Sequence, residues 1–314
     1  MYNANFKMNQ MYLPGKKTAF GSACVAAALL AVFWSNQQHV DSEARIQTPH
    51  NYECKPHNYT TEIVSVEPLL IYINDFLSSE EADLLVDLGT PSLASSEIYV
   101  NGQKVSSKTR TSRSGGLPPS SPLVSCILTR ALTFLGPAIP STKSHPYSSS
   151  SSQNSNPNPL SIFGTPQIVQ YGPGEHFSTH HDWYDRPQPL RDGSMDYTGG
   201  RWSFNRWGSF FVYLDEEAVG GETWFPHIEA RTPVLSSQGE DSEGGGEKRK
   251  WEKNTEEGRG TNFLPRKGNA LFWVNLHGNG TGDERVVHAG REVKGGKKTA
   301  MNLWPRVYYG GGGR

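Results

Sequence analysis

The chain has 314 residues, enough for one large domain or two small ones. Its 30 basic and 31 acidic residues give a net charge of −1, so nucleic-acid binding is not expected. Glycine (33 residues) and proline (21 residues) are frequent, which favours turns and short strands over long helices.

An uncharged segment near the N-terminus, residues 18–34, predicts a transmembrane signal anchor. As a helix it would span roughly 25 Å, slightly less than a bilayer core. Lysines precede it, so the positive-inside rule predicts a cytosolic N-terminus at residues 1–17 and a lumenal polar stem at residues 35–60. The expected location is the endoplasmic reticulum membrane, as a single-pass type II protein. A cleaved signal peptide and a buried helix are the alternatives.

The cysteines and two glycosylation motifs bear on the same compartment. Three cysteines are too few for a disulfide framework, and Cys24 lies in the apolar segment. Cys54 and Cys126 either pair in an oxidising compartment or are two unrelated buried thiols. Asn58 and Asn279 each begin an Asn-x-Thr motif, which predicts glycosylation of a lumenal domain.

A strand followed by an amphipathic helix opens the predicted domain, which extends over residues 61–309. Residues 63–73 are rich in β-branched side chains, Ser78 with the acidic residues after it predicts a helix start, and Gly89 predicts its end. Later strands are predicted from short apolar runs at 166–171, 209–214, 270–275 and 299–307. Many short strands with few helices predict a mostly β fold, a sandwich or jelly roll with flanking helices.

Two low-complexity stretches interrupt this pattern at residues 141–159 and 236–262. Both are rich in Ser, Gly, Asn or charged residues, so neither can bury enough apolar surface to offset the entropy of ordering it. We predict that they are disordered surface insertions within the one domain.

A His-x-Asp motif in the stretch GEHFSTHHDWYDRP predicts a metal site. If residues 176–184 form a strand, His180 and Asp182 share one face, while His181 and Trp183 share the other. An imidazole and a carboxylate with open coordination positions suit Fe(II) better than structural zinc. The alternative is a solvated loop.

A distant histidine and a lysine extend this motif. His288 lies more than a hundred residues after Asp182 and would complete a two-His-one-carboxylate triad. Lys298, ten residues further on, would pair with the far carboxylate of a dicarboxylate cosubstrate. The alternative for His288 is a structural histidine.

Five stretches occur in order along the chain: PLLIYINDFLSSEEADLL, QIVQYGPGEHFSTHHDWYD, FFVYLDEEAVGGETWFP, RKGNALFWVNL and HAGREVKGGKKTAMNLW. Over roughly residues 60–307 the chain resembles the prolyl 4-hydroxylases of the 2-oxoglutarate/Fe(II) dioxygenase superfamily. The resemblance implies a double-stranded β-helix core and hydroxylation of peptidyl proline at C4. It also implies the use of Fe(II), 2-oxoglutarate, O₂ and L-ascorbate.

Carried over by position, the resemblance implies His180, Asp182 and His288 as iron ligands and Lys298 as the residue that binds the distal carboxylate of 2-oxoglutarate. The remaining implied site residues are Tyr171, Ser209 and Trp304 for the cosubstrate, and Arg110 and Ser112 for the peptide. Trp183 and Tyr184 are further candidates for an aromatic groove that binds an extended proline-containing segment, and the alternative for each is a core aromatic.

The chain departs from the family pattern near the lysine. Glu292 stands where proline is usual and Thr299 where tryptophan is usual, which leaves the choice between Lys297 and Lys298 open. The ten-residue offset from His288 and the strand alternation favour Lys298.

The expected function is that of a lumenal, membrane-anchored peptidyl-prolyl 4-hydroxylase acting on a proline-containing peptide or protein. One alternative is a 2-oxoglutarate oxygenase with a different target. Another is a non-catalytic jelly-roll binding module. Whether a partner subunit is needed stays open.

Overall fold

The computed structural model describes residues 52–136, with short gaps at 97, 101–102 and 106–107, and residues 159–190, 201–230 and 249–310. The predicted segments 1–17 and 18–34, the stem up to residue 51 and residues 141–158 of the first insertion lie outside these described residues. Within them, no helix combines the length and apolar character needed to cross a membrane.

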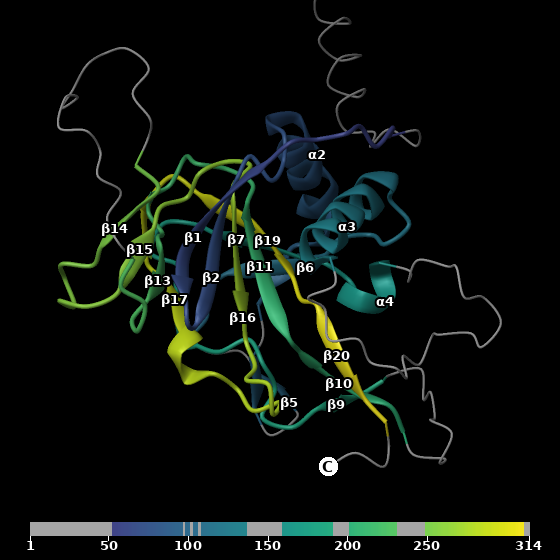
Figure 1. Ribbon diagram of the computed structural model, residues 1–314. Helices are drawn as coiled ribbons and strands as arrows, with labels where there is room; N and C mark the ends of the chain where they lie inside the picture. Colours follow the sequence, from purple (N-terminus) through teal and green to yellow (C-terminus); the bar gives the residue numbers. More distant parts are fainter. Residues whose placement is uncertain are drawn as a thin grey trace, which may run out of the picture. The chain divides into compact units, whose positions relative to one another are not determined.

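Two antiparallel sheets, packed face to face, form the body of the described domain (Figure 1). The larger sheet consists of β1 (Thr60–Val66), β2 (Leu69–Asn74), β3 (Ala94–Ser95), β6 (Arg113–Gly116), β7 (Gln167–Tyr171), β11 (Gly208–Tyr213), β16 (Ala270–Val274) and β19 (Lys298–Leu303). The smaller sheet consists of β8 (Phe177–His180), β13 (Thr223–Phe225), β14 (Trp251–Lys253), β15 (Thr261–Phe263) and β17 (His288–Gly290). Their orders are β1-β2-β16-β11-β19-β7-β6-β3 and β14-β15-β13-β17-β8.

Shorter strands lie beside these sheets. They are β4 (Ile98–Val100) with β5 (Gln103–Val105), β12 (Val219–Gly220) with β18 (Val293–Gly295), and the group β9 (Gln188–Pro189), β10 (Ser203–Arg206) and β20 (Arg306–Tyr309). The predicted mostly β fold with a jelly-roll core and flanking helices is confirmed.

The central strand β11 shows why the apolar runs predicted strands. All six of its residues are buried, because it is covered on both faces. Phe210 and Val212 pack towards the helices, whereas Phe211 and Tyr213 pack between the two sheets. Burial on both faces replaces the usual alternation of polar and apolar residues with a continuous apolar run.

Helices cover the outer face of the larger sheet (Figure 1). They are α2 (Ser79–Gly89), α3 (Pro122–Leu135) and α4 (Pro159–Phe163). The described residues also contain 3₁₀ turns at Thr90–Ser92 and Glu284–Val286. The predicted start of α2 is confirmed, since Ser78 and Glu81 cap each other reciprocally. Gly89 is the last helical residue and Thr90 the cap, one residue later than predicted. Sequence reasoning missed α3, whose start is marked by Pro122.

The prediction of a disordered insertion at 236–262 is wrong for residues 249–262. β14 and β15 begin there and pair with each other, and β15 also pairs with β13 in the smaller sheet. Trp251 and Phe263 are buried and their rings pack against Tyr72. The charged residues around Trp251 conceal this apolar anchor in the composition of the segment. Residues 236–248 lie outside the described residues.

Residues 52–60 of the predicted stem contact the domain. Cys54 forms a disulfide with Cys126 of α3, so the pairing that the sequence left open is present. The Tyr52 hydroxyl donates a hydrogen bond of 2.7 Å to Glu81, which also forms a 2.7 Å ion pair with Arg130 of α3. The segment before β1 is therefore tied to both long helices.

Removing this disulfide is expected to lower stability. The bond closes a loop with a sequence separation of 72 residues, and Cys54→Ser should cost about 2–4 kcal/mol of unfolding free energy. Urea unfolding of the oxidised protein measures this loss. Cys126→Ser and the double variant are the controls, because each should lose the same amount. Additive losses in the double variant would contradict the prediction.

Candidate active site

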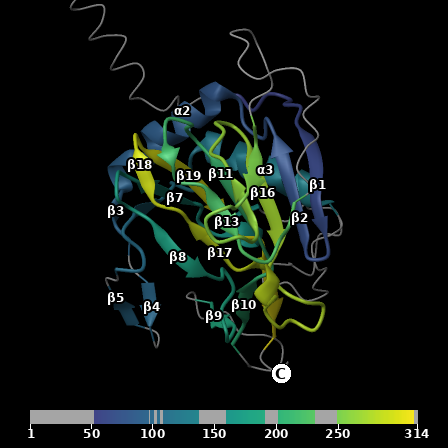
Figure 2. The same ribbon diagram turned by 90° about the vertical axis from the view of Figure 1, so that its left-hand side faces the viewer.

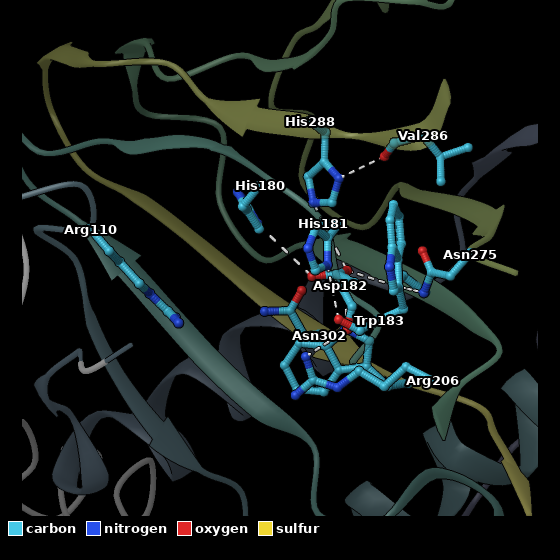
Figure 3. Close-up of polar contacts among 12 residues, drawn as sticks. Arg110, His180, His181, Asp182, Trp183, Arg206, Asn275, Val286, His288 and Asn302 are labelled. Atoms are coloured by element: carbon cyan, nitrogen blue, oxygen red, sulfur yellow. Dashed lines mark hydrogen bonds and ion pairs between the residues drawn. The ribbon is translucent and has the colours of Figure 1, made fainter. Parts of the chain in front are cut away.

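Three side chains that can bind a metal converge in a cavity between the two sheets (Figure 3). The ligand atoms of His180, Asp182 and His288 lie within 4.8 Å of one another. The Nε2 atoms of both histidines are 3.9 Å from the Asp182 carboxylate, each from a different oxygen. The structure thus brings together the three residues predicted to hold iron.

The pairing of β8 with β17 explains how residues so far apart in sequence meet. His288 is the direct cross-strand partner of His180 in this pair, and their ring centroids are 4.4 Å apart. Figure 2 shows β8 and β17 side by side. Asp182 lies in the turn just after β8 ends at His180. The predicted strand over 176–184 is therefore too long.

Hydrogen bonds and burial prepare both imidazoles to bind a metal. The Nδ1 atoms of His180 and His288 lie 2.8 and 3.1 Å from the carbonyl oxygens of Ser178 and Val286. Because a carbonyl can only accept, the proton resides on Nδ1 and the Nε2 lone pair faces the cavity. Burial, reinforced by the neighbouring His288, lowers the pKa of His180 to about 3. Burial also lowers the pKa of His288, so both rings are neutral at pH 7.

The carboxylate of Asp182 is ionised and held in one orientation. Burial would raise its pKa, but the two imidazoles, Arg206 and the Ser209 hydroxyl outweigh this effect and lower it. Oδ2 accepts hydrogen bonds from Ser209 Oγ at 2.6 Å and from Trp304 Nε1 at 3.1 Å. Asn275 Nδ2 donates to Ser209 Oγ at 2.9 Å, so a chain of two hydrogen bonds supports the carboxylate.

Lys298 lines the same cavity and is 1% exposed. It lies on β19 opposite Tyr171 of β7, and its Nζ donates to Thr223 Oγ1 at 3.3 Å. Burial lowers the pKa of Lys298 to about 7, although Glu222 and Asp215 act in the opposite direction. No carboxylate of the described residues lies within ion-pair distance of Nζ. This ammonium group can therefore pair with an anion that enters the cavity.

The neighbouring Lys297 is placed differently. Its side chain is 47% exposed and its Nζ lies 3.8 Å from Glu217. It therefore points to the protein surface, and Lys298 is the lysine that can reach a cosubstrate.

The other residues implied by the resemblance divide between the cavity and its surroundings. Tyr171, Trp304, Arg110 and Tyr184 line the cavity. Ser209 is not among the lining residues and instead donates to Asp182.

Two residues assigned to the peptide are buried away from the cavity. Ser112 is 1% exposed, and its hydroxyl contacts Ser96 and accepts from Arg110. Trp183 belongs to the core between the sheets and packs so closely on Gly282 that a Cβ there would lie 2.1 Å from the indole. Neither side chain lines the cavity.

The position of His181 differs from the prediction that it would face away from His180 and Asp182. It lines the cavity together with His180 and Asp182, because β8 ends at His180 and the turn that follows loses the two-residue period. Its ring stacks on Trp183 with centroids 4.2 Å apart.

Sequence reasoning also missed further residues that line the cavity. They are Gln167, Phe177, Arg206, Phe211, Thr223, Gly290 and Asn302. The signal for Arg206 is its position at the end of β10, directly before the apolar run of β11. The cavity measures about 210 Å³, and its lining provides metal ligands, a buried cation and aromatic walls.

The donor set fits Fe(II). Two neutral imidazole nitrogens and one carboxylate oxygen would bind an Fe(II) ion from one side. The cavity leaves the other side of the ion accessible to further ligands. Such a set is typical of iron oxygenases, whereas structural zinc sites are closed and rich in thiolates.

Comparison with known proteins agrees with an iron oxygenase site. Residues 166–306 match the family model described as the 2OG-Fe(II) oxygenase superfamily. Prolyl 4-hydroxylase 1 of Arabidopsis thaliana is 27% identical over 254 residues, which cover 79% of this chain and 72% of that protein. The prolyl 4-hydroxylase subunit alpha-3 of Mus musculus is 27% identical over 249 residues, but this chain spans only 35% of its length.

Among solved structures, the viral collagen prolyl hydroxylase of Paramecium Bursaria Chlorella virus-1 covers 76% of this chain and 96% of its own, with 20% identity and a TM-score of 0.44. The family match covers His180, Asp182, His288 and Lys298. The chain is therefore a prolyl 4-hydroxylase-like 2-oxoglutarate-dependent dioxygenase, which matches the 2OG-Fe(II) oxygenase superfamily over residues 166–306.

Proposed function

We propose that the protein hydroxylates proline residues of a peptide or protein at C4, with Fe(II), 2-oxoglutarate and O₂ as cofactor and cosubstrates. L-ascorbate would restore iron that becomes oxidised. The observation that carries the proposal is one cavity that holds a complete His-Asp-His triad together with a buried lysine that lacks an acidic partner among the described residues.

Each of these residues has a distinct task. His180, Asp182 and His288 would hold the iron, and Lys298 would bind the distal carboxylate of 2-oxoglutarate. When bound, iron and 2-oxoglutarate supply the oxidant for C–H hydroxylation from O₂, with succinate and CO₂ as by-products. The protein positions the target carbon and keeps the cavity walls, such as Phe211, shielded from bulk water.

The aromatic lining of the cavity suits an extended proline-containing segment. Tyr184 and Trp304 are part of this lining. Polyproline II segments fit such surfaces because they are already extended and cost little entropy to order. The side chain of Arg110, implied by the resemblance to contact the peptide, also reaches this region.

Mass spectrometry of proline-containing peptides after incubation with the protein, Fe(II), 2-oxoglutarate and ascorbate tests the proposal. Fragmentation should locate one added oxygen on proline, with stoichiometric release of succinate. Asp182→Ala is the inactive control, and Lys297→Gln is the matched surface control. Succinate release coupled to oxygen on another residue would identify a different target. Absence of both metal and 2-oxoglutarate binding would identify a non-catalytic module.

We further propose a type II protein of the endoplasmic reticulum membrane, with residues 18–34 as its anchor and the catalytic domain in the lumen. The Cys54–Cys126 disulfide supports an oxidising compartment. The acceptor residues Asn58 and Asn279 are both exposed, as glycosylation requires.

Glycosylation provides the test of this location. Expression of the full chain in eukaryotic cells should give a protein whose electrophoretic mobility increases on endoglycosidase treatment. Asn58→Gln and Asn279→Gln should each remove one glycan, and the double variant should be insensitive to the enzyme. A wild-type protein without glycans, digested by protease from the cytosolic side, would contradict the lumenal location.

A further inference from the structure

The cavity contains more positive than negative charge. Three cationic side chains line it, Arg110, Arg206 and Lys298, against the single carboxylate of Asp182. If the proposed function holds, Asp182 and the two carboxylates of 2-oxoglutarate balance the charge of Fe(II) and Lys298. The two guanidinium groups then remain without a negative partner inside the cavity.

Arg206 is held by neutral groups. Its guanidinium carbon lies 3.5 Å from the centre of the Trp304 ring and 4.9 Å from that of Tyr184. Nη1 donates to the backbone oxygen of Asp182 at 3.1 Å, and no carboxylate of the described residues accepts a hydrogen bond from it. Its position is thus fixed by aromatic stacking and one backbone contact, while most of its N–H donors remain available to a ligand.

Arg110 is held in the same manner. Nε donates to Ser112 Oγ at 3.2 Å, Nη2 donates to Gln167 Oε1 at 3.3 Å, and the guanidinium carbon lies 4.7 Å above the Phe177 ring. All three partners are uncharged. Figure 3 shows Arg110 and Arg206 reaching towards the site from different sides.

We propose that Arg110 and Arg206 form an anion subsite, which selects substrates that carry a carboxylate next to the target proline. This inference rests on the proposed function, because it concerns the substrate of that site. A carboxylate matches the planar fork of a guanidinium, and partial burial in the cavity strengthens the charge-assisted hydrogen bonds. The carboxylate would come from an adjacent Asp or Glu side chain, or from the proline's own C-terminal carboxylate.

Matched peptides separate these sources. One pair has Asp or Asn next to an internal proline. A second pair ends on proline as a free acid or as an amide, and free L-proline is the third arm. Fluorescence anisotropy measures binding to the protein loaded with Fe(II) and 2-oxoglutarate in the absence of O₂, with free L-proline added as a competitor. Hydroxylation of each peptide is measured in parallel.

The acid member of at least one pair is expected to bind about tenfold more tightly than its amide, the size of one charge-assisted hydrogen bond. Arg206→Gln and Arg110→Gln should each reduce this preference, and Lys297→Gln should leave it unchanged. Arg110→Gln is the cleaner variant, because Arg110 makes no hydrogen bond to Asp182.

Two results would overturn the subsite. The first is equal binding of acid and amide in both pairs. The second is an equal loss of acid and amide affinity in each arginine variant, as expected if the guanidinium groups bind peptide carbonyls. An acid preference in binding without hydroxylation of any peptide would support the subsite and refute the proposed proline hydroxylation.

Discussion

Replacing Lys298 with methionine is expected to weaken the binding of 2-oxoglutarate about a hundredfold or more, because its distal carboxylate would be buried without a counter-charge. Methionine has a similar length and no charge, so the cavity walls formed by Tyr171 and Phe211 should be retained. Anaerobic isothermal titration of the Fe(II)-loaded protein measures this loss. Lys297→Gln, which removes a neighbouring surface charge, should bind as wild type does.

The same binding should depend on pH in a defined direction. The pKa of Lys298 in the free protein is lowered to about 7 by burial, and a bound carboxylate would raise it. Below about pH 7 the lysine is already protonated, so affinity should be constant there. Above that pH, binding must take up a proton, and affinity should fall about tenfold per pH unit. A constant affinity up to about pH 9 would show that the lysine is charged without its ligand.

Lys298→Met should also separate function from stability. A buried lysine whose pKa is depressed destabilises the folded protein at pH 7, because the unfolded state binds the proton more tightly. The variant should therefore unfold at a higher temperature than wild type while it loses 2-oxoglutarate binding. A lower unfolding temperature would show that the contact of Lys298 with Thr223 outweighs the cost of its burial.

The strands that build the site could be predicted because their burial leaves a strong local signal. The predicted strand at 209–214 corresponds to β11 at Gly208–Tyr213, and that at 270–275 to β16 at Ala270–Val274. Helix α2 was equally clear from its capping residues. In each case the signal lies within a few residues of the element that it specifies.

The parts that could not be predicted depend on contacts between distant segments. That His288 lies directly opposite His180 follows from the register of β17 on β8, which no local pattern encodes. The two strands β14 and β15 depend on one tryptophan, Trp251, that packs into a core formed by other strands. Arg206 reaches the cavity because it stacks on Trp304, almost a hundred residues away in sequence.

Ser209→Ala is expected to weaken metal binding about tenfold to a hundredfold, the range typical of residues that hold a metal ligand in place. The Ser209 hydroxyl makes the shortest contact to the Asp182 carboxylate, 2.6 Å to Oδ2. Without it, one of the bonds that hold the carboxylate in its orientation is lost, and a buried anion keeps one hydrogen bond fewer. Competition with a coloured chelator, using Co(II) without O₂, measures the affinity independently of turnover.

Ser209→Thr is the matched control, because it retains the hydroxyl and should bind the metal nearly as wild type does. Asn275→Leu should have a smaller effect in the same direction, since Asn275 contacts the serine and not the carboxylate. Trp304→Phe removes the second donor to Oδ2. Both donors bond the same oxygen, so either one alone still orients the carboxylate in part. The double variant should therefore lose more metal affinity than the sum of the losses in Ser209→Ala and Trp304→Phe. Wild-type affinity in Ser209→Ala would mean that the turn after β8 alone orients Asp182.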